Sequence, residues 1–282
     1  MNQQSSYFAP AGDLPPQTAM ITSRAVVRST YALIPRSSIT DNVRSNLPGW
    51  KATRCWILAA PAMGLGTAFV QYLIYLDEGG GCVQPEFEKG VESFLFILDG
   101  KADLQVGGRK TLLTGGGFAF IPADTEWSIQ NAGPATAKLL WLRRVFEACG
   151  DLKPQLIVGQ EQDVPVVYNR TSDQKWTTNL IPVNDMAYDM HMNIVCFGPG
   201  ATISAIEAHI MEHGLYMLQG KGVYLLNEQW HEVQEGDFIW MRAFCPQAYY
   251  AGGPVPTRYL LYKNMNRQIP LRGPKAEQAL KV

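Results

Sequence analysis

The sequence predicts an all-β protein made of two tandem β-barrels of the jelly-roll kind. Short apolar segments follow one another, glycine clusters at residues 79–81 and 115–117 separate some of them, and no long stretch keeps a helical period. Two separated motifs also recur at one constant spacing. Many short strands with regular turns are typical of sandwiches and barrels, and a long repeat indicates two copies of one unit.

The amino-acid composition indicates a globular protein and argues against nucleic-acid-binding and membrane-spanning proteins. The 282 residues suffice for two ordinary domains, and 46% hydrophobic with 17% charged residues describes a well-packed globular chain. A net charge of −1 gives no broad basic surface for nucleic acid. The five cysteines form no Cys-x-x-Cys pair, and no apolar run reaches the roughly 18 residues of a membrane span. We therefore expect a cytoplasmic protein with reduced thiols, no secretory signal, and no nucleic-acid or membrane partner.

Taken in order, the chain begins with a polar stretch, residues 1 to about 22, that we expect to form a loosely docked arm. Strands are expected where short runs rich in β-branched and aromatic residues occur. In the first half these runs are 25–28, 31–34, 54–58, 68–76, 94–98, 102–106, 117–121 and 138–142. The polar tail after Arg267 is expected to be weakly ordered.

The repeat relates the two halves of the chain. Residues 94–100, Phe-Leu-Phe-Ile-Leu-Asp-Gly, match residues 214–220, Gly-Leu-Tyr-Met-Leu-Gln-Gly, and residues 116–122 match residues 236–242. Both matches lie 120 residues apart. A constant offset over two separated motifs predicts that each half folds as one barrel.

Candidate metal ligands cluster in the second half. The chain has four histidines, and His209 and His213 lie four residues apart, with Glu207 two residues before the first. In a strand, residues i and i+2 point to the same face, so Glu207 and His209 project side by side and His213 joins them after a bend. A carboxylate with two imidazoles is a metal-binding set without thiolate that suits Mn, Fe or Ni. A chance pair of nearby histidines is the alternative that the spacing alone leaves open.

The surrounding residues resemble the two-part motif of cupins. A Pro-Gly turn at residues 199–200 precedes the set, Gly220 closes the first part, and the second part runs from Gly236 through an apolar strand to Gln247. The order Glu-x-His-x-x-x-His with a distant Gln is similar to that of the (S)-ureidoglycine aminohydrolases, the glyoxylate-induced-protein type of bicupin. The similarity extends over residues 24–267, about the whole chain, and is strongest after residue 186.

This resemblance implies a set of site residues. Glu207, His209, His213 and Gln247 would hold the metal, which the family resemblance gives as Mn²⁺. Tyr224 lies eleven residues after His213 and Lys263 sixteen after Gln247, and both match family positions that contact substrate. Catalytic roles then fall to Glu207 and Lys263. Without the resemblance, a core tyrosine and a strand-end surface lysine would be the simpler interpretations of these two residues.

Two other histidines lie outside the motif. His191 is in an alternating strand, Asp-Met-His-Met-Asn-Ile-Val, and we place it second among substrate-binding candidates, with a position in the barrel wall as the alternative. His231 follows a predicted hairpin turn at Asn227-Glu228 and is expected to be exposed to solvent.

The repeat also indicates which half is active. At the spacing of 120 residues, the four metal positions fall on Phe87, Lys89, Ser93 and Trp127, and none of these is a matching ligand. We therefore expect residues 1–147 to form an N-terminal barrel with its arm and a lost metal site. Residues 148–185 would be a linker, and residues 186–282 a C-terminal barrel that binds metal and is catalytic.

The implied reaction is the hydrolysis of (S)-ureidoglycine to (S)-ureidoglycolate and ammonia, a step of purine and allantoin degradation. Two alternatives stay open on the sequence. One is another metal-dependent cupin enzyme, a dioxygenase or isomerase acting on a small carboxylic acid. The other is a bicupin that binds a small ligand without catalysis. Bicupins of this kind usually assemble, so a homo-oligomer is expected.

Overall fold

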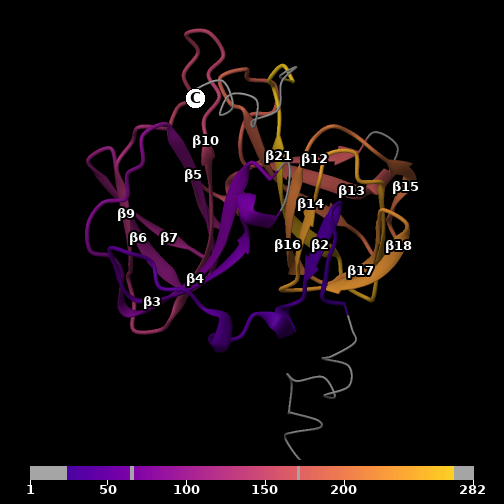
Figure 1. The fold of residues 1–282 in the computed structure, drawn as a ribbon, viewed down its shortest axis with the longest axis horizontal. Coiled ribbons are helices and arrows are strands. Elements are labelled where there is room, and N and C mark those ends of the chain that lie inside the picture. The colour runs from indigo at the N-terminus through magenta and orange to yellow at the C-terminus, as the bar shows by residue number, and fades with distance from the viewer. Residues whose placement is uncertain (1–23, 64–66, 170–171, 270–282) are drawn as a thin grey trace, which may run out of the picture.

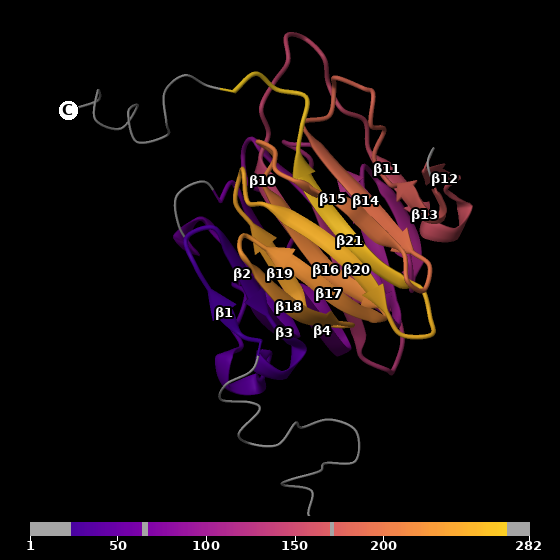
Figure 2. The same ribbon diagram turned by 90° about the vertical axis from the view of Figure 1, so that its right-hand side faces the viewer.

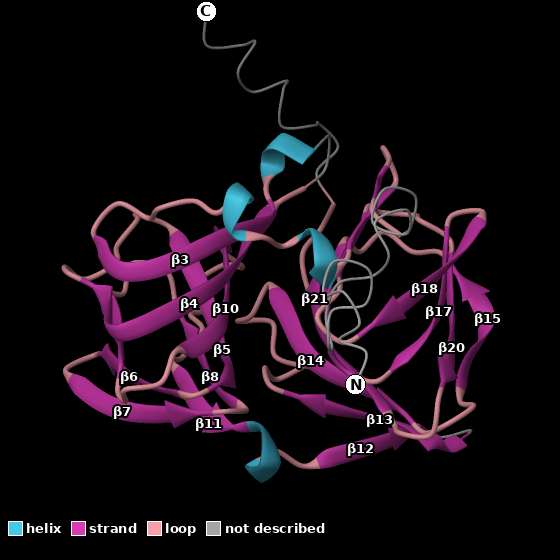
Figure 3. Cartoon of the chain, turned by 90° about the horizontal axis from the view of Figure 1, so that it is seen from below, coloured by secondary structure: helices cyan, strands magenta, loops and turns pink. Residues whose placement is uncertain are grey.

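The computed structural model describes residues 24–63, 67–169 and 172–269, and it contains two β-barrels side by side (Figure 1). The all-β fold class and the bicupin architecture predicted from the sequence are confirmed. Within these residues the only helices are four short 3-10 turns in connections between strands (Figure 3): η1 (Arg36–Ser38), η2 (Asp41–Val43), η3 (Pro61–Met63) and η4 (Glu161–Asp163). The predicted N-terminal arm and nearly all of the C-terminal tail lie outside the described residues.

The first barrel is one nine-stranded sheet in the order β11-β8-β5-β10-β4-β9-β6-β7, with β3 paired to β4. Its strands are β3 (Trp50–Ala59), β4 (Phe69–Cys82), β5 (Val91–Asp99), β6 (Lys101–Val106), β7 (Arg109–Thr114), β8 (Gly117–Ile121), β9 (Trp127–Asn131), β10 (Ala137–Val145) and β11 (Ile157–Gln160). Each of the eight strand segments predicted in the first half falls on one of these strands or on β1 or β2.

The second barrel combines an eight-stranded sheet, β1-β2-β19-β16-β21-β14-β13-β12, with a four-stranded sheet, β15-β20-β17-β18 (Figure 2). Its strands are β1 (Val26–Val27), β2 (Tyr31–Ile34), β12 (Val166–Asn169), β13 (Ser172–Asn179), β14 (Met190–Phe197), β15 (Thr202–Glu207), β16 (His213–Gln219), β17 (Lys221–Leu226), β18 (Gln229–Gln234), β19 (Phe238–Met241), β20 (Gln247–Gly252) and β21 (Thr257–Asn264).

The predicted repeat is visible strand by strand. β6, β7, β9 and β10 begin 120 residues before β17, β18, β20 and β21. Pairing also crosses the two halves, because β2 runs antiparallel to β19, with Tyr31 opposite Met241 and Ile34 opposite Phe238. The N-terminal strands thus extend the sheet of the second barrel. The exact domain boundaries given above stay a prediction.

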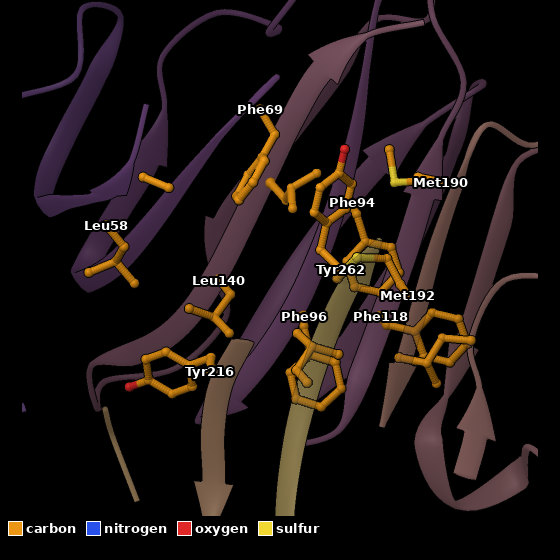
Figure 4. Packing of buried hydrophobic residues seen from close by; sticks show 14 of the residues in the cluster. Leu58, Phe69, Phe94, Phe96, Phe118, Leu140, Met190, Met192, Tyr216 and Tyr262 are labelled. Carbon is orange, nitrogen blue, oxygen red and sulfur yellow. The ribbon is translucent and has the colours of Figure 1, made fainter. Parts of the chain in front are cut away.

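The two barrels pack face to face through one continuous apolar core. On β14, Met190, Met192 and alternate residues beyond them point toward the first barrel, where they join Phe94, Phe96 and Phe118 (Figure 4). The intervening residues Val195 and Phe197 belong instead to the interior core of the second barrel. Because successive side chains in a strand point to opposite faces, β14 separates the inter-barrel core from the barrel interior.

Aromatic rings fill the first barrel where the second has its candidate ligands. Trp127, the counterpart of Gln247, is 4% exposed, and its ring centroid lies 5.3 Å from that of Trp141. Trp141 also stacks on Trp50 and donates its Nε1–H to Ser93, the counterpart of His213. The space that a metal and substrate would need is therefore occupied by packed indole rings.

Candidate active site

The two motif histidines meet inside the second barrel. His209 follows the end of β15, and His213 begins β16, so the loop between them folds one imidazole toward the other. Their Nε2 atoms are 3.1 Å apart, and the ring planes make an angle of 80°. His213 is 3% exposed, whereas His209 is half-buried.

Burial and hydrogen bonding set the state of these rings. Burial, and then the neighbouring Lys263 ammonium, lower the pKa of both imidazoles, that of His213 strongly. Both rings are therefore neutral at pH 7. His213 donates its Nδ1–H to the carbonyl of Tyr262 at 3.3 Å, which leaves the lone pair on Nε2. A neutral imidazole with one nitrogen tied to a carbonyl is the usual state of a metal-ligating histidine.

Gln247 completes the convergence. It is 4% exposed at the start of β20, and its Nε2 lies 3.0 Å from Nε2 of His209. Its Oε1 accepts a hydrogen bond from the Tyr224 hydroxyl at 2.9 Å. A flip of the Gln247 side-chain amide by about 180° would point Oε1 at the histidines and let Nε2 donate to the Tyr224 oxygen. The donor set therefore fits a metal ion.

Glu207 lies near this group without joining it. It ends β15 opposite Gln247, yet it is exposed. Across residues 24–63, 67–169 and 172–269, no three His, Cys, Asp or Glu side chains are grouped so as to hold a metal. The structure thus brings together His209, His213 and Gln247 of the four predicted ligands and leaves the carboxylate at the rim.

Lys263 and His191 share one row of side chains with His213. In the strand register, Lys263 on β21 lies opposite His213 on one side and His191 on the other, so all three point into the barrel. Burial lowers the pKa of the Lys263 ammonium, and the nearby Glu207 carboxylate partly opposes this shift. His191 is 5% exposed, and its Nε2 has no hydrogen-bond partner within the described part of the chain.

Two interior residues escaped the sequence reasoning. Tyr259 on β21 is 3% exposed and hydrogen-bonds Tyr224, with ring centroids 6.5 Å apart. Asn193 on β14 is 7% exposed, and its buried Oδ1 has no hydrogen-bond partner among the described residues. Strand alternation could have identified both residues, because alternate residues of a strand point to the same face. Tyr259 lies on the same face of β21 as Lys263, and Asn193 on the same face of β14 as His191.

His231 corrects an expectation. It is half-buried, where exposure to solvent was predicted, because the ring of Tyr31 on the N-terminal strand β2 packs against it. Its Nε2 lies 3.0 Å from the hydroxyl of Tyr31. Since β2 comes from the far end of the chain, the hairpin pattern around His231 gave no sign of this contact.

Comparison with known proteins agrees with the fold. The model of the cupin domain family matches residues 73–143 and again 193–262. An (S)-ureidoglycine aminohydrolase of Escherichia coli K12 is 30% identical over 252 residues, which cover 89% of this chain and 94% of that protein. A probable (S)-ureidoglycine aminohydrolase of rice is 35% identical over 87% of this chain and 76% of its own length.

The chain belongs to the (S)-ureidoglycine aminohydrolase family. The crystal structure of a glyoxylate-induced protein from Pseudomonas aeruginosa is also similar, with a TM-score of 0.85 and 41% identity over 95% of this chain and 99% of that one. In this aminohydrolase-family chain, no described helix is long and apolar enough to cross a membrane.

Proposed function

We propose that the second barrel hydrolyses (S)-ureidoglycine to (S)-ureidoglycolate and ammonia. One observation carries the proposal: His209, His213 and Gln247 converge inside a barrel whose relatives are named as aminohydrolases of this substrate. The reaction replaces one C–N bond by a C–O bond, and water supplies the oxygen. It belongs, on this proposal, to purine and allantoin degradation.

The metal is part of the proposal. Glu207, His209, His213 and Gln247 would hold Mn²⁺, which would orient the substrate and polarise it as a Lewis acid. The exposed Glu207 carboxylate is placed to move inward, because it lies opposite Gln247 at the end of a strand that has a register shift. The same freedom would let it carry a proton away from the attacking water.

The remaining roles follow from burial and hydrogen bonding. Partial burial lowers the pKa of Lys263, so it gives up a proton more readily than a surface lysine. It could protonate the departing amine or balance the substrate carboxylate. With the Gln247 amide turned so that Oε1 faces the histidines, the Tyr224 oxygen accepts from Nε2 and holds the amide in place, and the tyrosine proton is then free to be donated to the substrate. His191 offers an unpartnered nitrogen within the described residues.

The decisive test is ammonia release from ureidoglycine generated in place. Chelated protein would be assayed with and without added Mn²⁺, alongside His209→Ala and the control His231→Ala, which removes a histidine on another strand. We expect Mn²⁺-dependent release above the spontaneous rate, lost in His209→Ala and kept in His231→Ala. No release above background would refute the reaction, and oxygen uptake with a small carboxylic acid would point to a dioxygenase instead.

A further inference from the structure

A carboxylate lies in the loop between the two histidines and joins it to the first barrel. Glu212 is 2% exposed, and each of its oxygens accepts one hydrogen bond. Oε1 accepts from Nε1 of Trp240 on β19 at 2.6 Å, and Oε2 accepts from the backbone N–H of Ala68, just before β4, at 3.0 Å. The first barrel is therefore bonded directly to the histidine loop.

The backbone of the same residue is also fixed. The N–H of Glu212 donates to Oδ1 of Asn264 at the end of β21, at 2.7 Å. Three separate elements thus hold one residue: the start of β4, strand β19 and the end of β21. A loop residue held from three sides has little freedom to move, and His213 is its immediate neighbour.

The first barrel also reaches the other surroundings of His213. The ring of Phe69 packs against Gly214, where an added Cβ would come within 2.7 Å of it. Tyr262, whose carbonyl accepts from His213, accepts a hydrogen bond at its hydroxyl from Nη1 of Arg144 at 3.2 Å. Phe69 and Arg144 both belong to the first barrel. The first barrel therefore contacts the residue before His213, the residue after it, and the residue whose carbonyl accepts its hydrogen bond.

We propose that Glu212 is a positioning residue through which the first barrel sets the placement of the His209–His213 loop. The barrel that lacks its own ligands thereby helps to fix the spacing of the two imidazole nitrogens. The part of this inference that concerns metal affinity rests on the proposed function. The part that concerns the loop itself does not.

The chemistry of the partners makes Glu212→Gln a sharp variant. Both partners are N–H donors, so a carboxylate satisfies both, whereas an amide must aim its own NH₂ at one of them. Partners that orient metal ligands typically affect affinity by about 10–100-fold. We expect the Mn²⁺ dissociation constant to rise at least about tenfold. We also expect faster hydrogen exchange in peptides spanning residues 208–213 of the metal-free protein.

Glu161→Gln is the matched control. Glu161 of η4 pairs with Arg258 of β21, toward the opposite end of that strand from Lys263. The substitution therefore removes a carboxylate contact between the two barrels at a distance from the histidine loop. This variant is expected to lower the melting temperature while leaving both the Mn²⁺ dissociation constant and exchange in residues 208–213 unchanged. A merely structural role for Glu212 would make the two variants behave alike.

A double variant tests the two-donor geometry. Trp240→Phe removes one of the two N–H donors. When Glu212→Gln is added, the glutamine NH₂ can face the phenylalanine ring while the glutamine oxygen accepts from the N–H of Ala68. The double variant should therefore bind Mn²⁺ more tightly than Glu212→Gln alone. Losses that simply add would overturn the proposed geometry.

The outcomes separate the inference from the proposed function. Unchanged Mn²⁺ affinity and unchanged loop exchange in Glu212→Gln would overturn the positioning role. If the wild-type protein binds no Mn²⁺, the proposed metal is wrong. Hydrogen exchange in the metal-free protein then still decides whether Glu212 holds the loop.

Discussion

At the scale of single residues, the hydroxyl of Tyr224 has one described acceptor, the amide of Gln247. Removing it in Tyr224→Phe frees the amide to rotate, and we expect about tenfold weaker Mn²⁺ binding, the usual order for a partner that orients a ligand. Competition with a coloured chelator measures this. Tyr250→Phe, on the exposed outer side of the same sheet, is the control and should leave the affinity unchanged. Equal affinities for both variants would contradict an orienting role.

Position 214 has room only for glycine, because side chains of the first barrel pack against its backbone. Its virtual Cβ lies 2.7 Å from Cζ of Phe69 and 3.1 Å from Oε1 of Gln71, so a methyl group has no room between the barrels. We expect Gly214→Ala to lower the free energy of unfolding by about 1–3 kcal/mol, as overpacking in cores does. Chemical denaturation measures it. Gly133→Ala, where nothing lies within 4 Å of the added atom, should be close to neutral. A stable Gly214→Ala protein would show that the interface can spread apart.

Single residues also mark where sequence reasoning ended. The positions of His209, His213 and Gln247 followed from a motif, and the structure brings them together. Glu212 did not follow, because an acidic residue in a loop is usually exposed. What makes it a buried acceptor is the N–H of Ala68, 144 residues away in the chain. A contact of that kind has no local signature.

At the scale of elements, β5, β10 and the residue just before β14 bring ionisable groups together between the barrels. The side chains of Glu92, Arg144 and Asp189 are each at most 2% exposed, and Arg144 lies 3.2 Å from the Asp189 carboxylate. Burial, and then the neighbouring Asp189 carboxylate, raise the pKa of Glu92 well above its ordinary value. The folded protein therefore keeps a proton on Glu92 at a pH where the unfolded chain has lost it.

Stability is expected to fall with rising pH because of Glu92. Because the folded pKa of Glu92 is raised, its stabilising share is complete below the unfolded pKa, near 4.5, and is lost as pH rises through the folded value. Glu92→Gln keeps the shape and cannot ionise. Its melting temperature relative to wild type should therefore increase from pH 5 to pH 8, as calorimetry can measure. A difference that falls with pH would mean that Glu92 is ionised and paired with Arg144.

Element pairing was predictable only in part. Alternation and the spacing of 120 residues placed the strands, because each barrel repeats one local pattern. The partner of β2 was not predictable, since the sequence places Tyr31–Ile34 beside the first barrel whereas the structure pairs them with β19. Pairing between distant strands depends on which sheet edges and apolar faces remain available in the folded protein, and a local sequence pattern does not contain that information.

At the scale of the whole molecule, assembly into a homo-oligomer stays a proposal, and one outer face suits it. On the four-stranded sheet, Trp230 and Tyr250 are 51% and 48% exposed, with ring centroids 5.4 Å apart. Tyrosine and tryptophan are enriched at protein–protein interfaces relative to the rest of the surface. We expect light scattering to give a mass above the 31.3 kDa of one chain, and Trp230→Asp to lower it. A monomeric wild-type protein would exclude assembly.

The final prediction concerns the second barrel alone. A fragment of residues 172–282 would uncover Met190, Met192, Ile194 and Phe238, all at most 2% exposed in the full chain. Burying four such side chains contributes about 6–12 kcal/mol, comparable to the whole stability of a domain. The fragment would also lose β2, which pairs with β19, and β1, which pairs with β2. We therefore expect it to aggregate.

Co-expression offers the decisive comparison for that fragment. Supplying residues 1–169 as a second chain restores both the apolar cover and β2, so a soluble complex of the two pieces is expected. Sedimentation and thermal unfolding would measure the fragment with and without its partner piece. A fragment that is soluble, unfolds cooperatively and binds Mn²⁺ as tightly as the full chain would show that the first barrel is dispensable. It would also contradict the positioning role of Glu212, because Ala68 would be absent.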